Sequence, residues 1–532
     1  MRLRMMSAAL AAATMLAVSA GPMLAQGDTL RVTRVSDFPT CFHPVCFATG
    51  NQYMNFQLLF NSLVKVDADE STYIPDLADT WDVSPDATEF TFQLNPDAKW
   101  HDGTPVTADD VIYTAATGAQ MADAYVGTYP IDNWLSVEGA ADVLGTTDIP
   151  VGLEKIDDHT VKFTLAAPNA LFLRSLVDPA YMIMPKHILE GMTVDELKAS
   201  DFVNGVGTIG SGPYKLVNYT PDVGIEYEAN AEYHKGAPNI PNLIFALGVS
   251  ADTAAAQLLN DELDIVFDLK PSDFAVLDGQ DGINAARVPG IGVQFIQFNA
   301  QNPATSDPRV RQAMAYGFDR RTLLETVFEG AGSLLWGPPA FDQDDPELDR
   351  YEFDPEKAEA LLAEAEADGW DRGQPLRLIY IQEEPGWPEI AAAFANDMTA
   401  LGLNVVLEPS DGAGWQARLP FPGDYEISLQ CCGSFFHPDR NSSMFSTEAP
   451  AGTFYGNPEV EQGFKDARAT GSPEEQAAIY QNIARILNEA SPYIYMWFVA
   501  NTHANSTDVQ NFTYYPNARE SFSQIEKWTL AE

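Results

Sequence analysis

The residue types best suited to chemistry gather in one short stretch, residues 424–441, which reads DYEISLQCCGSFFHPDRN. It brings together sulfur, imidazole, carboxylate and aromatic groups on Cys431, Cys432, Gly433, Ser434, Phe435, His437 and Asp439. A glycine allows close backbone approach, and exposed rings beside a lone imidazole are typical of the floor of a ligand cleft. A strand end followed by an ordinary buried loop is the alternative, and this stretch alone does not decide between them.

A strand is the element that must position these groups. Positions 425, 427, 429 and 431 are apolar and alternate with polar positions 426, 428 and 430. This period of two predicts a half-buried strand over residues 425–431, with the reactive groups following at its end.

Motifs for catalysis or for a resident metal are missing from the sequence. The seven histidines include no H-E-x-x-H motif or close pair, so a zinc enzyme is not expected. The G-x-G-x-x-G at residues 205–210 follows no strand pattern, and Pro213 interrupts the helix that a dinucleotide site needs. No G-x-S-x-G elbow is present, and the acidic loop 341–349 lacks the glycine and terminal glutamate of a calcium loop. The sequence predicts no enzyme and no cofactor.

Aromatic residues form a second group of candidates. Trp336, Trp387 and Trp415 lie in the same part of the chain as the 424–441 stretch. Each ring alone is more often part of a core than a platform for a ligand. As a set, some of them are expected to line the cleft.

The N-terminus predicts export. Positive charge at residues 2 and 4 precedes an apolar segment, and residues 1–25 read as a signal peptide with cleavage after Ala25, or alternatively after Ala20. No cysteine follows that segment until Cys41, so no lipid anchor is expected. The mature chain is therefore predicted to be periplasmic.

Size and charge bound the rest. The chain has 532 residues, which predicts two or three lobes, and alternating helix and strand patterns predict an α/β class. Its net charge of −46 excludes a nucleic-acid partner. The charge is read as a solvated acidic coat or as attraction for cationic ligands.

Four cysteines in an exported chain predict disulfides. Pairing Cys41 with Cys46 closes a short loop and leaves Cys431 and Cys432 as a vicinal pair. Two cross-links between these segments are the other options, and all three connectivities stay open.

The most informative block covers residues 63–111. An alternating strand over residues 89–94 would bury Phe90, Phe92 and Leu94. A turn at residues 102–103 follows, and then a helix with Thr107 as N-cap and Asp110 three residues later. Asp307 and Asp354 each precede a proline and predict two further helices, the second ending near Gly369.

This block resembles family 5 of the extracellular solute-binding proteins of ABC importers, the dipeptide-, oligopeptide- and nickel-binding group. The resemblance rests on LVKVD and PDLADTW, the strand FTFQL, and the run WHDGTPVTADDV at residues 100–111. Ordered matches continue over nearly the whole mature chain, at residues 157–163, 183–187, 210–216, 230–236, 263–265, 298–299, 307–313 and 319–320.

The resemblance implies a periplasmic-binding-protein-like α/β fold (type II, cluster C), with two main lobes, an inserted domain and a hinged ligand cleft. Lobe I would comprise residues 27–62, 185–292 and 503–532. Lobe II would be the insertion 63–184, and lobe III, residues 293–502, would close over the ligand. The implied function is a monomeric substrate-binding component that captures a peptide or peptide-sized solute and delivers it to a permease in the inner membrane.

The resemblance also implies that dipeptide-binding members hold the peptide ammonium with an aspartate and the carboxylate with an arginine. Those positions fall near Ser434 and Glu383 here, so both ion-pair anchors are missing, although Asp439 could still hold an ammonium. The expected ligand is a longer peptide held through its backbone, or a neutral or cationic solute such as an oligosaccharide or an amine.

The predicted ligand-binding residues come from four segments of the chain. They are Phe42, His43, Trp336, Gln382, Glu383, Trp387, Trp415, Cys431, Cys432, Gly433, Ser434, Phe435, His437 and Asp439. Because nickel binders occur in the family, a chelated metal between His43 and His437 is a minor alternative. An exported carboxylate-based hydrolase and a chemosensory or chaperone-like role also stay open.

Overall fold

The computed structural model describes most of the chain after residue 27. The described residues are 28–34, 42, 53–67, 72–120, 132–178, 181–193, 196, 199–200, 202, 205–250, 253–384, 386–434, 437–445, 453–515 and 521–531. The predicted signal peptide lies outside them. No helix within these ranges has the length and apolar character needed to cross a membrane.

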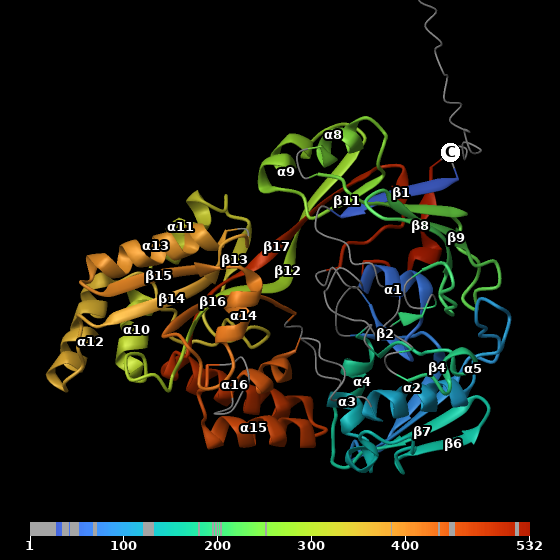
Figure 1. Cartoon of the computed structure of the whole chain (residues 1–532), viewed down its shortest axis with the longest axis horizontal. Coiled ribbons are helices and arrows are strands. Elements are labelled where there is room, and N and C mark those ends of the chain that lie inside the picture. Colours follow the sequence, from blue (N-terminus) through green and yellow to red (C-terminus); the bar gives the residue numbers. More distant parts are fainter. Residues whose placement is uncertain are drawn as a thin grey trace, which may run out of the picture.

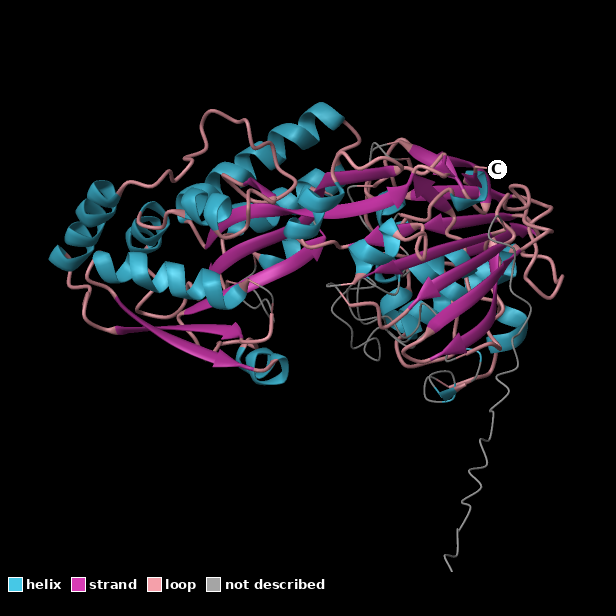
Figure 2. Ribbon diagram, turned by 90° about the horizontal axis from the view of Figure 1, so that it is seen from above, coloured by secondary structure: helices cyan, strands magenta, loops and turns pink. Residues whose placement is uncertain are grey.

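Two bodies stand side by side and are joined by two long strands, β12 (Ile283–Phe298) and β17 (Tyr493–Ser506) (Figures 1 and 2). These strands pair antiparallel and belong to one eleven-stranded sheet that runs through both bodies in the order β15-β14-β16-β12-β17-β11-β1-β10-β9-β8, with β13 beside β17. Their register shifts between Pro289 and Val293. Such an irregularity bends a strand pair, and here it lies where the strands pass from one body to the other.

The first body contains β1 (Thr29–Arg34), which pairs parallel with β10 (Asn242–Ala246) and β11 (Ile265–Phe267). The strands β9 (Gly224–Ala229) and β8 (Tyr214–Thr220) extend this part of the sheet. Helices α1 (Tyr53–Leu59), α8 (Ala254–Leu259) and α9 (Pro271–Leu277) belong to the same body.

A separate four-stranded sheet covers the lower part of this body in Figure 1. Its order is β4 (Ala78–Val83), β5 (Glu89–Leu94), β7 (Thr160–Thr164) and β6 (Leu153–Asp157). The predicted inward face of β5 is confirmed, because Phe90, Phe92 and Leu94 are buried. Helix α2 (Ala108–Gln120) begins as predicted, with the Asp110 carboxylate accepting a hydrogen bond from the Thr107 N–H at 2.9 Å.

One hydrophobic core joins this small sheet to the large one. Leu30 of β1, Phe92 of β5 and Val111 of α2 all belong to it. Predicted lobes I and II therefore share one core, and their exact division stays a prediction.

The second body is built on β14 (Pro375–Ile381), β15 (Asn404–Ser410) and β16 (Ile427–Ser434). Helices α10 (Pro308–Tyr316), α12 (Pro355–Ala367) and α13 (Trp387–Ala400) pack on one face, and α15 (Pro458–Ala469) and α16 (Pro473–Ala490) pack on the other. Strand β12 serves both faces, because Ile296 joins the first core and Phe295 the second.

Local sequence explains the helix ends. The Asp307 side chain accepts from the Arg309 N–H, and the Asp354 side chain accepts from the Lys357 N–H, each before a proline at the first helical position. Both predicted starts are confirmed. Gly369 follows α12 with φ of 98°, a left-handed conformation that favours glycine and ends the helix.

Strand β16 departs from its predicted pattern. Glu426 and Ser428, expected to face solvent, have exposed fractions of 7 % and 0 %. The reason is its place inside the sheet between β14 and β12, with helices over both faces. The prediction of a half-buried strand was wrong, because alternation in one strand does not reveal what covers the outer face.

The remaining elements are short. They are β2 (Val64–Val66), β3 (Tyr73–Pro75), α3 (Asp132–Leu135), α4 (Phe172–Leu176), α5 (Lys186–Leu189), α11 (Arg320–Thr326), β13 (Gly332–Leu334), α14 (Gly412–Arg418), β18 (Val509–Gln510) and β19 (Thr529–Leu530), with 3-10 turns at Ala140–Val143, Pro438–Met444 and Ile525–Lys527.

Candidate functional site

Three parallel strands end at the same edge of the second body. Strand β14 pairs parallel with β15 and with β16, so the carboxyl ends of all three meet there. In sheets of this kind the ligand crevice lies at the carboxyl ends of the strands. The residues that follow these ends include the loop 382–386, helix α14 and the 438–444 turn, and α14 lies on the side that faces the first body (Figure 1).

Two tryptophans support this edge from below. Trp387, the first residue of α13, is 1 % exposed, and its ring meets that of Trp415 edge to face at 5.6 Å. The Trp415 indole N–H donates to Ser428 Oγ at 3.1 Å. Trp387 is therefore part of the core, whereas the half-buried Trp415 connects α14 to the centre of β16.

The loop after β14 carries the acidic groups of this edge. Gln382 and Glu383 are exposed, and the Gln382 N–H donates to Ser410 O at 2.9 Å, which fixes the loop on the end of β15. Glu384 is half-buried, with its Oε1 3.8 Å from Cys431 Sγ, and burial raises the pKa of this carboxyl group. Sequence reasoning chose Glu383 and missed Glu384, because only the turn geometry decides which of two adjacent glutamates turns inward.

Cys431 takes part in a disulfide bond, in agreement with the prediction that disulfides form. The sulfur on the other side belongs to a cysteine whose side chain lies outside the described part of the chain. The three connectivities therefore stay open.

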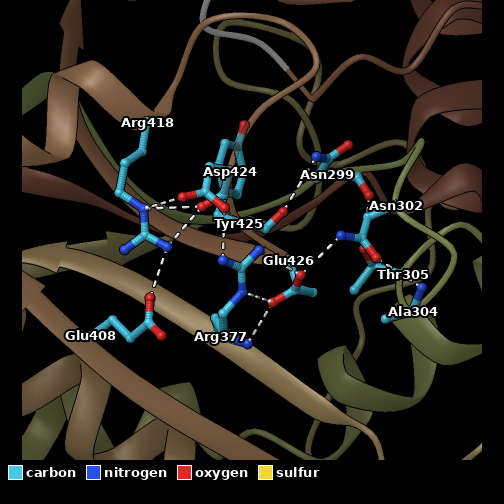
Figure 3. A network of polar contacts seen from close by, with 10 residues as sticks. All are labelled: Asn299, Asn302, Ala304, Thr305, Arg377, Glu408, Arg418, Asp424, Tyr425 and Glu426. Carbon is cyan, nitrogen blue, oxygen red and sulfur yellow. Dashed lines mark hydrogen bonds and ion pairs between the residues drawn. The ribbon is translucent and has the colours of Figure 1, made fainter.

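A polar network holds β16 beside β14 (Figure 3). The Glu426 carboxylate accepts hydrogen bonds from the Arg377 backbone N–H and guanidinium at 2.8–2.9 Å, and from Asn302 Nδ2 at 2.9 Å. Arg377 also pairs with Asp424 at 2.7 Å. This network explains how a glutamate can lie in a buried strand, because its charge is paired and its oxygens are satisfied.

A second group lies beyond the end of β16. Arg468 Nε binds the Asp439 carboxylate at 2.9 Å from each oxygen, and Arg468 Nη2 donates to Ser442 Oγ at 2.6 Å. A ligand ammonium at Asp439 would have to compete with this arginine. His437 Nδ1 accepts from the Asp439 N–H at 3.2 Å.

The two bodies touch again at this second group. The Ala170 N–H donates to Arg468 O at 3.1 Å, so the start of α4 contacts the end of α15. His437 lies near Arg174 of α4, and burial together with this guanidinium lowers the pKa of His437 to about 4. The imidazole is therefore neutral at neutral pH. Neither Arg174 nor Arg468 has a sequence pattern that marks it, because only the packing of the bodies brings them here.

The other predicted residues lie elsewhere or outside the described part. Phe42 is fully buried in the first body, with its ring 5.1 Å from that of Tyr219. Trp336 lies in the second body and donates its backbone N–H to Gln343 Oε1 at 2.9 Å. His43 and Phe435 are outside the described residues, as are the side chains of Cys432, Gly433 and Ser434 at the end of β16. The predicted set thus divides into a strand-edge group, an interbody group and separate residues.

Comparison with known proteins agrees with this architecture. The family model of the bacterial extracellular solute-binding proteins, family 5, matches residues 72–453. The dipeptide-binding protein of Escherichia coli (strain K12) is 25 % identical over 511 residues, covering 92 % of each chain.

Solved structures give the same result. The oligopeptide-binding protein AppA of Bacillus subtilis, in complex with a nonapeptide, superposes with a TM-score of 0.78 at 22 % identity, covering 95 % of this chain and 99 % of its own. The periplasmic binding protein AgaA of A. tumefacien R10, in complex with agropinic acid, superposes with a TM-score of 0.77 at 26 % identity, covering 95 % and 99 %.

These similarities confirm the periplasmic-binding-protein-like α/β fold. The family is one of transporter binding proteins, and the role of a substrate-binding component follows from it. The chain belongs to family 5 of the bacterial extracellular solute-binding proteins.

Proposed function

We propose that this chain is the receptor of an ABC importer that binds a peptide or peptide-sized solute between its two bodies and delivers it to a membrane permease. The observation that carries the proposal is the family match over residues 72–453, in a chain whose two bodies are joined by two strands. The relatives named for a dipeptide and solved with a nonapeptide support a peptide as the ligand.

The division of labour follows the predicted lobes. Residues 293–502 form the closing lobe, and the insertion 63–184 supplies the surface that it meets through Ala170 and Arg468. The shifted register of β12 and β17 supplies the hinge. Closure of the two bodies excludes water from the ligand and strengthens its polar contacts.

The chemistry of the strand-edge group favours a ligand that brings a cation. Glu384 is half-buried and lies beside Cys431, and no arginine occupies the loop 382–384 to clamp a carboxylate. A desolvated carboxyl group gains most when an opposite charge binds next to it. Asp439 is already paired with Arg468, so we assign the role of cation partner to Glu384.

The predicted residues near this edge are proposed to line the site together with Glu384. They are Gln382, Glu383, Trp415, Cys431, Cys432, Gly433, Ser434, Phe435 and His437. Phe42 and Trp387 lie in cores and act through packing alone.

A non-peptide solute is the second candidate, because one relative was solved with agropinic acid. An oligosaccharide, an amine or a chelated metal would require the same hinge. The carboxylate-based hydrolase is not favoured, because the family consists of transport receptors.

We also propose that the chain is exported after cleavage of residues 1–25 and works in the periplasm as a monomer. It carries no lipid anchor, binds no nucleic acid and needs no cofactor. The net charge of −46 supports the absence of nucleic-acid contacts.

Calorimetry with three alanine probes tests the ligand chemistry. Tetra-alanine with a free amine should bind, and N-acetylated tetra-alanine should bind at least about tenfold more weakly, as one lost charged contact predicts. The Glu384→Gln variant should remove this difference, whereas the exposed neighbour Glu383→Gln should preserve it. Tight binding of dialanine to the wild type, or an unchanged preference in Glu384→Gln, would refute the assignment.

A further inference from the structure

Three arginines surround one tryptophan on the second body. The guanidinium carbons of Arg320, Arg321 and Arg350 lie 5.2, 5.7 and 5.4 Å from the centroid of the Trp336 ring. They come from the start of α11 and from the segment before α12. None of the four residues belongs to the strand-edge or interbody group described above.

This concentration of positive charge runs against the composition of the chain. The sequence has 30 lysines and arginines against 76 acidic residues, yet three guanidinium groups repel one another around a single ring. Arg321 pairs with Glu352 at 2.8 Å, but both side chains are about half exposed, where such a pair contributes little. Among the described residues, Arg320 and Arg350 form no ion pair with a carboxylate.

The most unusual member is Arg320, which is 5 % exposed. Its Nη1 and Nη2 donate to the backbone carbonyls of Tyr495 and Arg350. Burial lowers the pKa of its guanidinium to about 10, and the neighbouring Arg321 acts in the same direction. A buried cation without a counter-charge is costly.

A second buried arginine of the same body shows a different solution. All three guanidinium nitrogens of Arg311 donate to carbonyls, namely those of Thr305, Ser306, Ala490 and Ser491. That arginine is used fully as a structural clamp. Arg320 makes only two such bonds and lines a cavity instead.

The cavity has a volume of about 130 Å³ and is lined by Phe318, Arg320, Arg321, Trp336, Tyr351 and Phe353, among others. A water molecule takes about 30 Å³ in the liquid, so this space suits a group of a few heavy atoms. Aromatic walls on one side and guanidinium donors on the other match a small oxyanion, because arginine binds phosphate and carboxylate oxygens with paired N–H groups.

We propose that this cavity is a binding site for a small oxyanion, held by Arg320 and by the two more exposed guanidinium groups of Arg321 and Arg350. The anion neutralises the buried charge of Arg320 and ties the start of α11 to the segment before α12. The shared chemistry is that of a tetrahedral phosphate or sulfate ion or of a carboxylate group. The site is independent of the solute-binding function.

Binding of inorganic phosphate, sulfate and acetate should be measured by calorimetry at fixed low ionic strength, set with chloride. At least one of the three should bind saturably to the wild type. Arg350→Gln should weaken that binding by about tenfold or more, which corresponds to one charged contact. Arg309→Gln, which removes a surface arginine of the same body, should leave it unchanged.

The order of affinities identifies the source of the oxyanion. Preference for phosphate or sulfate supports a free tetrahedral ion, and preference for acetate supports a carboxylate group. Arg350 is exposed, so its replacement should leave the far-ultraviolet circular dichroism unchanged and keep the comparison valid. Absence of saturable binding by all three anions, or equal binding by wild type and Arg350→Gln, would overturn the proposal.

Discussion

Replacing Glu426 by glutamine keeps the shape of a buried side chain and removes its charge. The carboxylate is 7 % exposed and accepts four hydrogen bonds, three from Arg377 and one from Asn302. Glutamine can accept at its oxygen, but its NH₂ group must face an N–H donor of Arg377. The substitution therefore loses charge-assisted bonds and leaves two donors opposed (Figure 3).

The expected loss follows from the exposure of the two partners. Breaking a fully buried ion pair costs about 3–5 kcal/mol. The Arg377 side chain is 31 % exposed and keeps its contact with Asp424, so water and that carboxylate compensate in part. We expect the free energy of unfolding of the second body to fall by about 2–3 kcal/mol.

Thermal and urea unfolding, followed by circular dichroism, measure this loss. A body of about 200 residues should lose roughly 4–10 °C in melting temperature. Glu359→Gln is the matched control, because its partner Arg372 and its own exposed position make it a surface pair, worth less than about 1 kcal/mol. Equal melting temperatures for Glu426→Gln and Glu359→Gln would refute the view that this network holds β16 in place.

Three further substitutions test other parts of the structure. Asp76→Asn should destabilise the first body by about 3–5 kcal/mol in thermal unfolding, because it leaves two lysines beside a fully buried position without their counter-charge; a loss below about 1 kcal/mol would contradict this. Gly210→Ala should also destabilise, because a Cβ there would lie 1.6 Å from Leu59 O, whereas Gly292→Ala meets no atom within 4 Å and should be tolerated; equal urea midpoints would disprove the clash. Burial and a nearby guanidinium lower the pKa of His437 to about 4, against about 6.5 in an unfolded chain, so its contribution is complete above pH 6.5 and is lost as the pH falls toward 4, by at most about 1.4 kcal/mol per pH unit; His437→Asn should flatten the stability profile only in that window, and an unchanged profile would count against it.

The helix starts could be predicted because their causes are local. Asp307 and Asp354 each cap a helix whose next residue is proline, and both the acceptor and the fixed φ are visible in four letters of sequence. The same holds for the alternation of Phe90 and Phe92 in β5, which covers a core with one face only.

The burial of β16 could not be predicted, because it depends on neighbours far away in the chain. Glu426 looks like a solvent-facing residue until Arg377 of β14 and Asn302 are placed beside it. Trp387 and Trp415 look equivalent in the sequence, although only packing against α13 and its neighbours buries the first completely.

The candidate site was only partly predictable for the same reason. The stretch after β16 was identified correctly as lying at a strand edge, since the strand pattern and the glycine are local. The contacts of Arg174 and Arg468 between the bodies, and the arginines around Trp336, arise from the tertiary fold and have no counterpart in spacing or composition.

Recovery of peptides from the protein tests the central claim most directly. The purified protein is incubated with a mixture of short peptides, desalted and denatured, and the released molecules are identified by mass spectrometry. A receptor should retain a subset of the peptides at no more than one molecule per chain and release them with unchanged masses. Conversion of peptides into fragments in amounts that grow with time, or the absence of any retained peptide, would contradict a peptide-binding receptor.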